Sequence, residues 1–159
     1  MTTTPISPLA GAPVLAHIDG GARGNPGDAG YGAYVASPGG EPIAEVWGFL
    51  GTRTNNYAEY VALLAALTYA IRSGAGSCSV RSDSELLVRQ IQGIYKVRHP
   101  GLQVLHRRAR ALIGKLKSFA IEHVRREQNR DADRLANRAM DERAGSGHFD
   151  LAELLGEGG

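Results

Sequence analysis

The chain has 159 residues, of which 43% are hydrophobic, and a net charge of +2; this predicts one globular domain and excludes a disordered chain. Its single cysteine, Cys78, excludes a disulfide framework and a zinc cluster built from thiolates, and it fits a reducing compartment. The first thirteen residues lack the pattern of a signal peptide, and no apolar run approaches the roughly 20 residues of a membrane span. We therefore expect no membrane partner.

After a flexible tail at residues 1–13, three strands are expected at residues 14–18, 31–36 and 43–49. Short turns join them, which predicts an antiparallel meander. The first strand ends in Asp19, and a carboxylate at the end of a buried strand is costly unless it is paired. It is either the cap of a turn or a metal ligand. Gly20 and Gly21 follow it and keep side-chain bulk away from a ligand.

A helix is expected from Asn56 to the glycines at positions 74 and 76. Its apolar residues recur at helical spacing: Tyr60, Leu63, Leu64, Leu67 and Ile71. Asn56 and Glu59 resemble a capping box, and Glu59 is expected in the first turn, at the rim of the buried side. An acid at a helix start that interacts with the helix dipole is the alternative interpretation of Glu59.

The second half alternates strands and helices, at residues 78–82, 86–91, 100–116, 119–124 and about 130–143. This alternation predicts parallel pairing and an α/β layer. Asp83 follows a strand and is a plausible N-cap for the next helix, while Asn129 is expected to cap the last helix, with Asp133 in its first turn. The domain is expected at residues 14–143. The glycine-rich, acidic tail at 144–159 is expected to be either mobile or docked as a short helix.

Positive charge is concentrated in one stretch. No acid lies between Glu85 and Glu122, and this span contains eight basic residues: Arg89, Lys96, Arg98, Arg107, Arg108, Arg110, Lys115 and Lys117. Such a block indicates a surface that faces a polyanion, or else a solvated helix face.

Asp19, Glu59, Asp83 and Asp133 share a position at strand ends or helix starts, which gather at one edge of an α/β sheet. Four converging carboxylates would repel one another unless cations held them. Ligand sets made only of oxygen suit Mg²⁺ or Mn²⁺. The residues alone therefore favour a metal-dependent nuclease or phosphotransferase.

Four ordered motifs carry a family resemblance. They are IDGGARGNPG (residues 18–27) with GYG (30–32), TNNYAE (54–59), SDS (82–84) and NRDADRLA (129–136). Together they resemble the motifs of type 1 ribonuclease H over residues 14–141. The resemblance implies the ribonuclease H fold, a five-stranded mixed sheet with three antiparallel strands and then two parallel ones, flanked by helices.

The resemblance also implies cleavage of the RNA strand of RNA–DNA hybrids into 3′-hydroxyl and 5′-phosphate ends, with two Mg²⁺ ions or substitute Mn²⁺ and a metal-bound water as nucleophile. Asp19 would bridge both ions, Glu59 and Asp83 would complete one site, and Asp133 would complete the other. Glu59 would also lie near the ribose 2′-hydroxyl, which distinguishes RNA from DNA. The residues implied to contact substrate are Gly20, Gly21, Asn25, Thr54, Asn55, Asn56 and Asn129, with Thr54 near a phosphate of the DNA strand.

The chain departs from the family pattern in the loop at 125–129. This loop lacks the histidine that many members carry, and His123 lies earlier, within the expected strand. Arg126 and Glu127 are candidates for the missing role. The short loop resembles the archaeal and plant-like branch of the family, so double-stranded RNA is a second possible substrate. Glu85 stands where many members have glutamine, and the short segment 93–102 indicates a reduced basic handle.

Two alternative functions, a non-catalytic binding module and a nuclease that cuts DNA, predict different residues at the site. A non-catalytic binding module would be expected to lack one of the four carboxylates, and all four are present. A related nuclease that cuts DNA is disfavoured by the glycines after Asp19 and by residues 54–56. We expect a cytoplasmic, monomeric enzyme.

Overall fold

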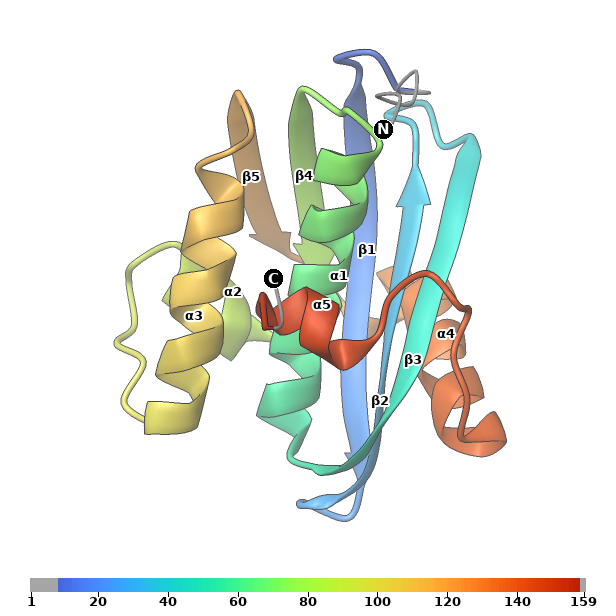
Figure 1. The fold of residues 1–159 in the computed structure, drawn as a ribbon, viewed down its shortest axis with the longest axis vertical. Helices are drawn as coiled ribbons and strands as arrows, with labels where there is room; N and C mark the ends of the chain where they lie inside the picture. The colour runs from blue at the N-terminus through green and yellow to red at the C-terminus, as the bar shows by residue number, and fades with distance from the viewer. Residues whose placement is uncertain (1–8, 158–159) are drawn as a thin grey trace.

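A computed structural model describes residues 9–157 of the chain. Five strands form one sheet in the order β3-β2-β1-β4-β5 (Figure 1). Their bounds are β1 (Pro13–Arg23), β2 (Gly27–Ala36), β3 (Pro42–Arg53), β4 (Ser77–Ser82) and β5 (Ser118–His123). The first three strands pair antiparallel, whereas β1 with β4 and β4 with β5 pair parallel. The expected mixed sheet is therefore confirmed.

The first two strands are longer than predicted. β1 continues four residues past Asp19, and β2 begins at Gly27. Glycine-rich stretches have low strand propensity by themselves, but here the two stretches pair with each other, with Asp19 opposite Gly32 and Gly21 opposite Gly30. The prediction that the strand ends at Asp19 was wrong. Backbone pairing with β2, which no pattern within the β1 segment indicates, extends the strand to Arg23.

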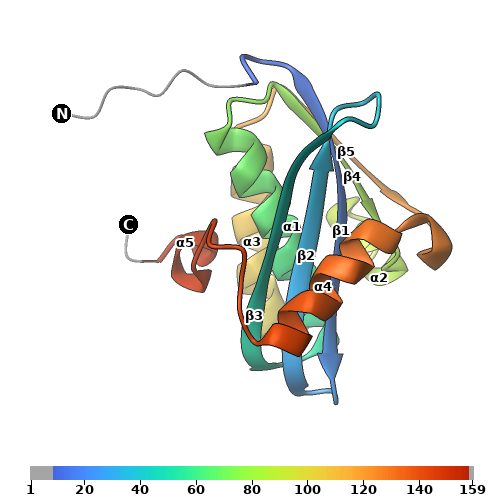
Figure 2. The same cartoon turned by 90° about the vertical axis from the view of Figure 1, so that its right-hand side faces the viewer.

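Helices cover both faces of the sheet (Figures 1 and 2). They are α1 (Asn55–Arg72), α2 (Glu85–Ile91), α3 (Pro100–Ile113), α4 (Arg130–Glu142) and α5 (Leu151–Leu155), with a short 3₁₀ turn, η1, at Arg126–Gln128. Figure 2 shows α4 alone on one side of β1–β3, and α1, α3 and α5 on the other.

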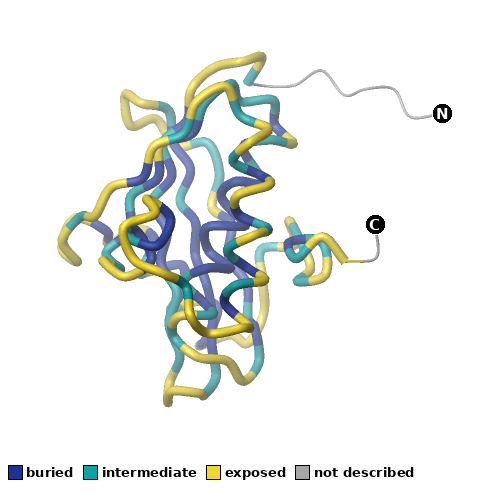
Figure 3. Tube along the Cα trace, turned by 90° about the vertical axis from the view of Figure 1, so that its left-hand side faces the viewer, coloured by how far each residue is buried: buried dark blue, intermediate teal, exposed yellow. Residues whose placement is uncertain are grey.

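The core lies around α1. Because the sheet, α3 and α5 surround this helix, apolar residues occupy nearly its whole circumference, as expected for a buried helix. The fully buried side chains include Tyr60, Leu63, Leu64 and Leu67. Figure 3 shows buried positions along the strands and the helix that faces them, with exposed loops at both ends. Within residues 9–157, no helix is both long and apolar enough to span a membrane.

Two predicted helix caps were wrong. The N-cap of α1 is Thr54, whose Oγ1 accepts a hydrogen bond from the Tyr57 amide at 3.1 Å. The N-cap of α2 is Ser84, not Asp83. In both cases a hydroxyl side chain one or two residues from the predicted residue makes the capping bond. Helix α1 thus begins earlier than expected, Glu59 lies in its second turn, and neither Glu59 nor Asp83 is used as a cap.

The two ends of the chain pack differently from the predicted tails. Residues 1–8 of the expected N-terminal tail lie outside the described residues, but the Leu9 and Gly11 amides donate to the carbonyls of Ser73 and Gly74 at 3.2 and 2.7 Å. These bonds fasten residues 9–12 to the end of α1.

The segment after α4 crosses the edge strand β3 and ends in α5. The Ser146 amide donates to the Trp47 carbonyl at 2.9 Å, and the Trp47 amide donates to Ser146 Oγ at 3.1 Å. Leu154 is buried against the core, and Arg108 Nε donates to its carbonyl oxygen at 3.2 Å. Of the two states expected for residues 144–157, the structure has the docked helix.

Leu154→Ala is expected to destabilise the fold by about 2–4 kcal/mol, because it removes a side chain that is only 1% exposed and leaves a cavity under α5. For a chain of this size, that corresponds to a decrease of roughly 5–15 °C in the melting temperature. Val104→Ala is the matched control, since Val104 is 52% exposed. Equal melting temperatures for the two variants would show that α5 does not contribute to the core.

Candidate active site

Asp19 and Asp83 lie side by side where β4 ends. The last pair of the β1–β4 register is Ile18 with Ser82, so the next residue on each strand is an aspartate. Ser82 is fully buried, and its Oγ accepts a hydrogen bond from the Ser84 amide at 3.0 Å, which shapes the turn that carries Asp83. Beyond Ile18, β1 pairs only with β2 and leaves space for the Asp19 side chain.

Glu59 reaches the same place because α1 rests directly on β1 at Gly20. A Cβ atom built on Gly20 would lie 2.3–2.4 Å from the carbonyl group of Ala58 and the amide nitrogen of Glu59. Real Cβ atoms essentially never approach backbone atoms so closely, so only glycine permits this contact. The prediction placed the Gly20 backbone close to a ligand. The structure shows a second role for Gly20: the absence of a side chain lets the helix that carries Glu59 dock directly on β1.

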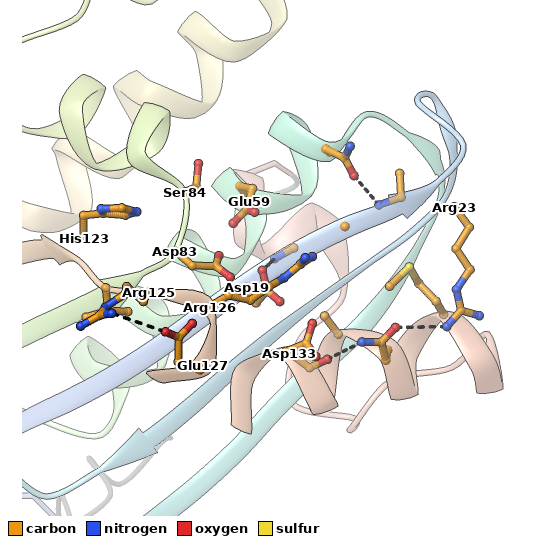
Figure 4. Close-up of a pocket in the computed structure, with 18 residues that line it drawn as sticks. Asp19, Arg23, Glu59, Asp83, Ser84, His123, Arg125, Arg126, Glu127 and Asp133 are labelled. Atoms are coloured by element: carbon orange, nitrogen blue, oxygen red, sulfur yellow. Dashed lines mark hydrogen bonds and ion pairs between the residues drawn. The ribbon is translucent and has the colours of Figure 1, made fainter. Parts of the chain in front are cut away.

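Asp19, Glu59 and Asp83 form a compact group of ligands. Each offers one carboxylate oxygen, and these three atoms all lie within 4.8 Å of one another. Among the described residues, Glu59 Oε2 is buried and has no hydrogen-bond partner. Asp133, in the first turn of α4, lines the same cleft and lies across from Asp19 (Figure 4). Three of the four predicted carboxylates can therefore reach one ion, and the fourth faces Asp19 from the opposite side of the cleft.

Burial and mutual repulsion shift the titration of this group. Desolvation, together with the charges of Asp83 and Asp133, raises the pKa of Asp19 to about 8. Desolvation, followed by the charge of Asp19, also raises the pKa of Glu59 well above its ordinary value. Desolvation raises the pKa of Asp83 too, although the nearby Arg126 opposes this shift. Ionised carboxylates in this arrangement require a cation, and hard oxygen donors suit Mg²⁺ or Mn²⁺.

The raised pKa of Asp19 predicts a pH dependence of stability in the metal-free protein. Below about pH 4, Asp19 is protonated in both the folded and the unfolded protein and does not lower the free energy of unfolding. As the pH rises from there toward about 8, the free energy of unfolding decreases, because the carboxyl ionises more readily in the unfolded chain than in its buried site. In EDTA, the difference in unfolding free energy between Asp19→Asn and wild type should grow with pH, by at most roughly 1.4 kcal/mol per pH unit. Urea unfolding at pH 5, 6.5 and 8 measures this difference. A difference that does not change with pH would contradict the shift.

The cleft around the carboxylates has a volume of about 880 Å³. Its lining includes residues that the sequence prediction missed, namely Arg23, Ser84, Arg125, Asn137 and Met140. Arg23 could have been found: positions 19, 21 and 23 of a strand share a face, but the strand was predicted to stop at Asp19. Arg126, Glu127 and His123, from η1 and the end of β5, complete one wall.

Six of the seven predicted substrate residues are divided between two cavities. Gly20, Gly21 and Asn55 line the carboxylate cleft, whereas Asn25, Thr54 and Asn56 line a second cavity of about 430 Å³. That cavity also contains Arg53, Tyr57 and His99, which the prediction did not include.

Hydrogen bonds join the two cavities through the start of α1. Asn25 Oδ1 accepts from the Asn55 amide at 3.0 Å, and Asn55 Oδ1 accepts from the Ala22 amide at 2.7 Å. The two asparagines therefore fix the turn between β1 and β2 against α1, and each leaves its side-chain NH₂ group for other partners.

Asn129 lines neither of these cavities. It is 1% exposed, and its Nδ2 donates to the Ile18 carbonyl at 2.8 Å. It occupies the N-cap position of α4 without making a side-chain cap bond. The prediction of a substrate contact was therefore wrong for Asn129, because its side chain is directed into the protein between α4 and β1.

Comparisons with known proteins agree on one family. A family model described as reverse transcriptase-like matches residues 17–139. The chain is 40% identical over 140 residues to ribonuclease HI of Halobacterium salinarum, which covers 88% of this chain and 70% of that relative. The crystal structure of LC11-RNase H1 in complex with an RNA/DNA hybrid matches with a TM-score of 0.78 and 38% identity, covering 82% of this chain and 98% of the other.

A longer relative is a bifunctional protein of Mycobacterium tuberculosis, 45% identical over 138 residues. The match covers 86% of this chain, but the chain spans only 38% of the length of that relative. The structure of the relative's N-terminal RNase H domain, solved as a fusion with maltose-binding protein, has a TM-score of 0.80 and covers 82% of this chain and 95% of that chain.

Proposed function

The chain belongs to the ribonuclease H family, and we propose that it is a metal-dependent endonuclease that hydrolyses the RNA strand of RNA–DNA hybrids. The observation that carries the proposal is the convergence of the Asp19, Glu59 and Asp83 oxygens within 4.8 Å in an open cleft. The hybrid bound to LC11-RNase H1 supports the substrate class. We further propose 3′-hydroxyl and 5′-phosphate products and a cytoplasmic site of action.

The three converging oxygens suit a hard divalent cation, and we propose two such ions, Mg²⁺ with Mn²⁺ as a substitute. Asp19, Glu59 and Asp83 would hold one ion, and Asp19 with Asp133 would hold the other. The buried, unpartnered Oε2 of Glu59 supports this assignment, because a ligand would satisfy it. When bound, such ions supply Lewis acidity toward the phosphate and lower the pKa of water.

The remaining groups of the cleft would bind and orient the RNA strand. Arg23 and Arg126 lie on different walls, so their charges would hold phosphates on either side of the reacting one. Ser84, Asn55 and Asn137 offer hydrogen bonds to ribose hydroxyls, and contacts with the 2′-hydroxyl distinguish RNA from DNA.

The second strand would lie over α3 and the start of α1. Lys96, Arg107 and Arg110 from the basic block line a cavity of about 340 Å³, and Thr54 lines the cavity of about 430 Å³. Positive charge along this path would bind a phosphate backbone without reading its sequence.

End-labelled RNA–DNA, RNA–RNA and DNA–DNA duplexes of one sequence, each incubated with Mg²⁺, Mn²⁺ or EDTA, test the proposal. We expect cutting of the RNA strand of the hybrid only when metal is present. Cutting of RNA–RNA as well would match the loop that lacks a histidine. Binding of the hybrid without cutting in any metal would overturn the proposal and leave a binding module. Sedimentation of the same protein tests the proposed monomer.

A further inference from the structure

Asn129 joins three elements that meet behind the carboxylates. Its amide donates to the Arg126 carbonyl at 3.0 Å, which closes η1, and its carbonyl accepts from the Asp133 amide at 3.1 Å, in the first turn of α4. Its side chain donates to the Ile18 carbonyl of β1 at 2.8 Å. One residue therefore contacts the loop, the helix and the strand that carry the cleft.

Asn129 occupies the N-cap position of α4, but its side chain does not cap the helix. Asparagine at an N-cap commonly accepts a hydrogen bond from a backbone amide two or three residues later. Here no such bond forms, and Oδ1 has no hydrogen-bond partner among residues 9–157. A buried acceptor without a partner is destabilising. The side chain therefore ties the start of α4 to β1 instead of capping the helix.

The bond to Ile18 links the backbone positions of two carboxylates. Ile18 immediately precedes Asp19, and it is the last β1 residue that pairs with β4. Asp133 lies one helical turn beyond Asn129, and its amide bonds to the Asn129 carbonyl. This side-chain hydrogen bond therefore links the backbone beside Asp19 directly to the start of the helix that carries Asp133, at the place where β4 no longer supports β1. The same helix also packs on β2 at Gly32, the residue opposite Asp19.

We propose that Asn129 is a positioning residue that sets the separation of Asp19 and Asp133 and thereby the affinity of the centre for divalent ions. This inference rests on the proposed metal-dependent function. A looser link would leave each carboxylate intact but would let α4 move relative to β1. Groups that orient metal ligands typically contribute 10–100-fold to metal affinity, so a loss in that range is expected without the bond.

Asn129→Leu keeps a side chain of similar size and removes the donor. Calorimetric titration of the free protein with Mn²⁺ should show a Kd raised about 10-fold or more. The Mg²⁺ concentration for half-maximal hydrolysis should rise in parallel, while kcat at saturating Mg²⁺ should change much less. If Asn129→Leu does not fold, Asn129→Ser provides the test, because serine suits an N-cap but is shorter than asparagine.

Gln92→Leu is the matched control. Gln92 Nε2 donates to the Ile121 carbonyl at 3.0 Å, which is also an amide bonded to a strand carbonyl, but on the edge strand β5. This variant should bind Mn²⁺ as wild type does. Wild-type Mn²⁺ affinity in the Asn129 variants, or an equal loss in Gln92→Leu, would overturn the inference. Wild-type protein that binds Mn²⁺ but leaves hybrids intact would overturn the proposed function alone, because the titration does not depend on hydrolysis.

Discussion

Asp19→Asn is expected to reduce hydrolysis of RNA–DNA hybrids by about 10³-fold or more while raising the stability of the metal-free protein. Asp19 is the carboxylate that faces both Asp83 and Asp133, so its loss removes a ligand from each proposed ion. A loss of about 4 kcal/mol in transition-state stabilisation corresponds to that factor. The gain in stability follows because asparagine has no charge to ionise in a site where burial raises the pKa of the carboxyl to about 8.

Initial rates on a labelled hybrid and melting temperatures in EDTA at pH 8 measure the two effects. Glu41→Gln is the control, because it makes the same change from acid to amide at an exposed turn between β2 and β3. A variant that lost activity because it no longer folded would show that Asp19 is structural. A variant that kept activity would remove Asp19 from the metal centre.

Gly20→Ala is expected to destabilise the protein by about 3 kcal/mol or more and to abolish hydrolysis. The added methyl group would overlap the backbone of Ala58 and Glu59, and neither backbone segment can rotate away as a side chain could. Overpacking of this kind typically costs 1–3 kcal/mol, and sometimes more. To relieve the overlap, α1 must move off β1, and Glu59 would move with it.

Gly21→Ala provides the comparison for stability. A Cβ atom on Gly21 would lie 3.6 Å from Met140 Cε, which is ordinary van der Waals contact. Urea unfolding should therefore separate the neighbouring variants, with Gly21→Ala close to wild type. Equal stabilities for Gly20→Ala and wild type would show that α1 does not approach β1 so closely.

The sequence predicted the order of elements and the convergence of carboxylates because both depend on local patterns. Asp83 follows a strand, and Asp133 lies in the first turn of a helix, as expected. The features that were missed depend on contacts between distant residues. The extension of β1 needs the pairing of Gly21 with Gly30, and the inward direction of Asn129 needs a carbonyl 111 residues away.

The helix caps show a different limit. Thr54 and Ser84 lie within two residues of the predicted caps, Asn56 and Asp83, and all four residue types favour N-caps. Propensity alone cannot choose between such neighbours. The choice has a consequence for the site, because the hydroxyl caps leave Asp83 and Glu59 available to face Asp19.

The crossing of β3 by the C-terminal segment also bears on solubility. An edge strand presents unpaired amide and carbonyl groups that can pair with another chain. Ser146 occupies both groups of Trp47 on this edge. A chain shortened before Ser146 would leave the edge open, and we expect it to self-associate through β3 even where its cleft is intact. We therefore expect the C-terminal segment to limit self-association at this edge of the sheet.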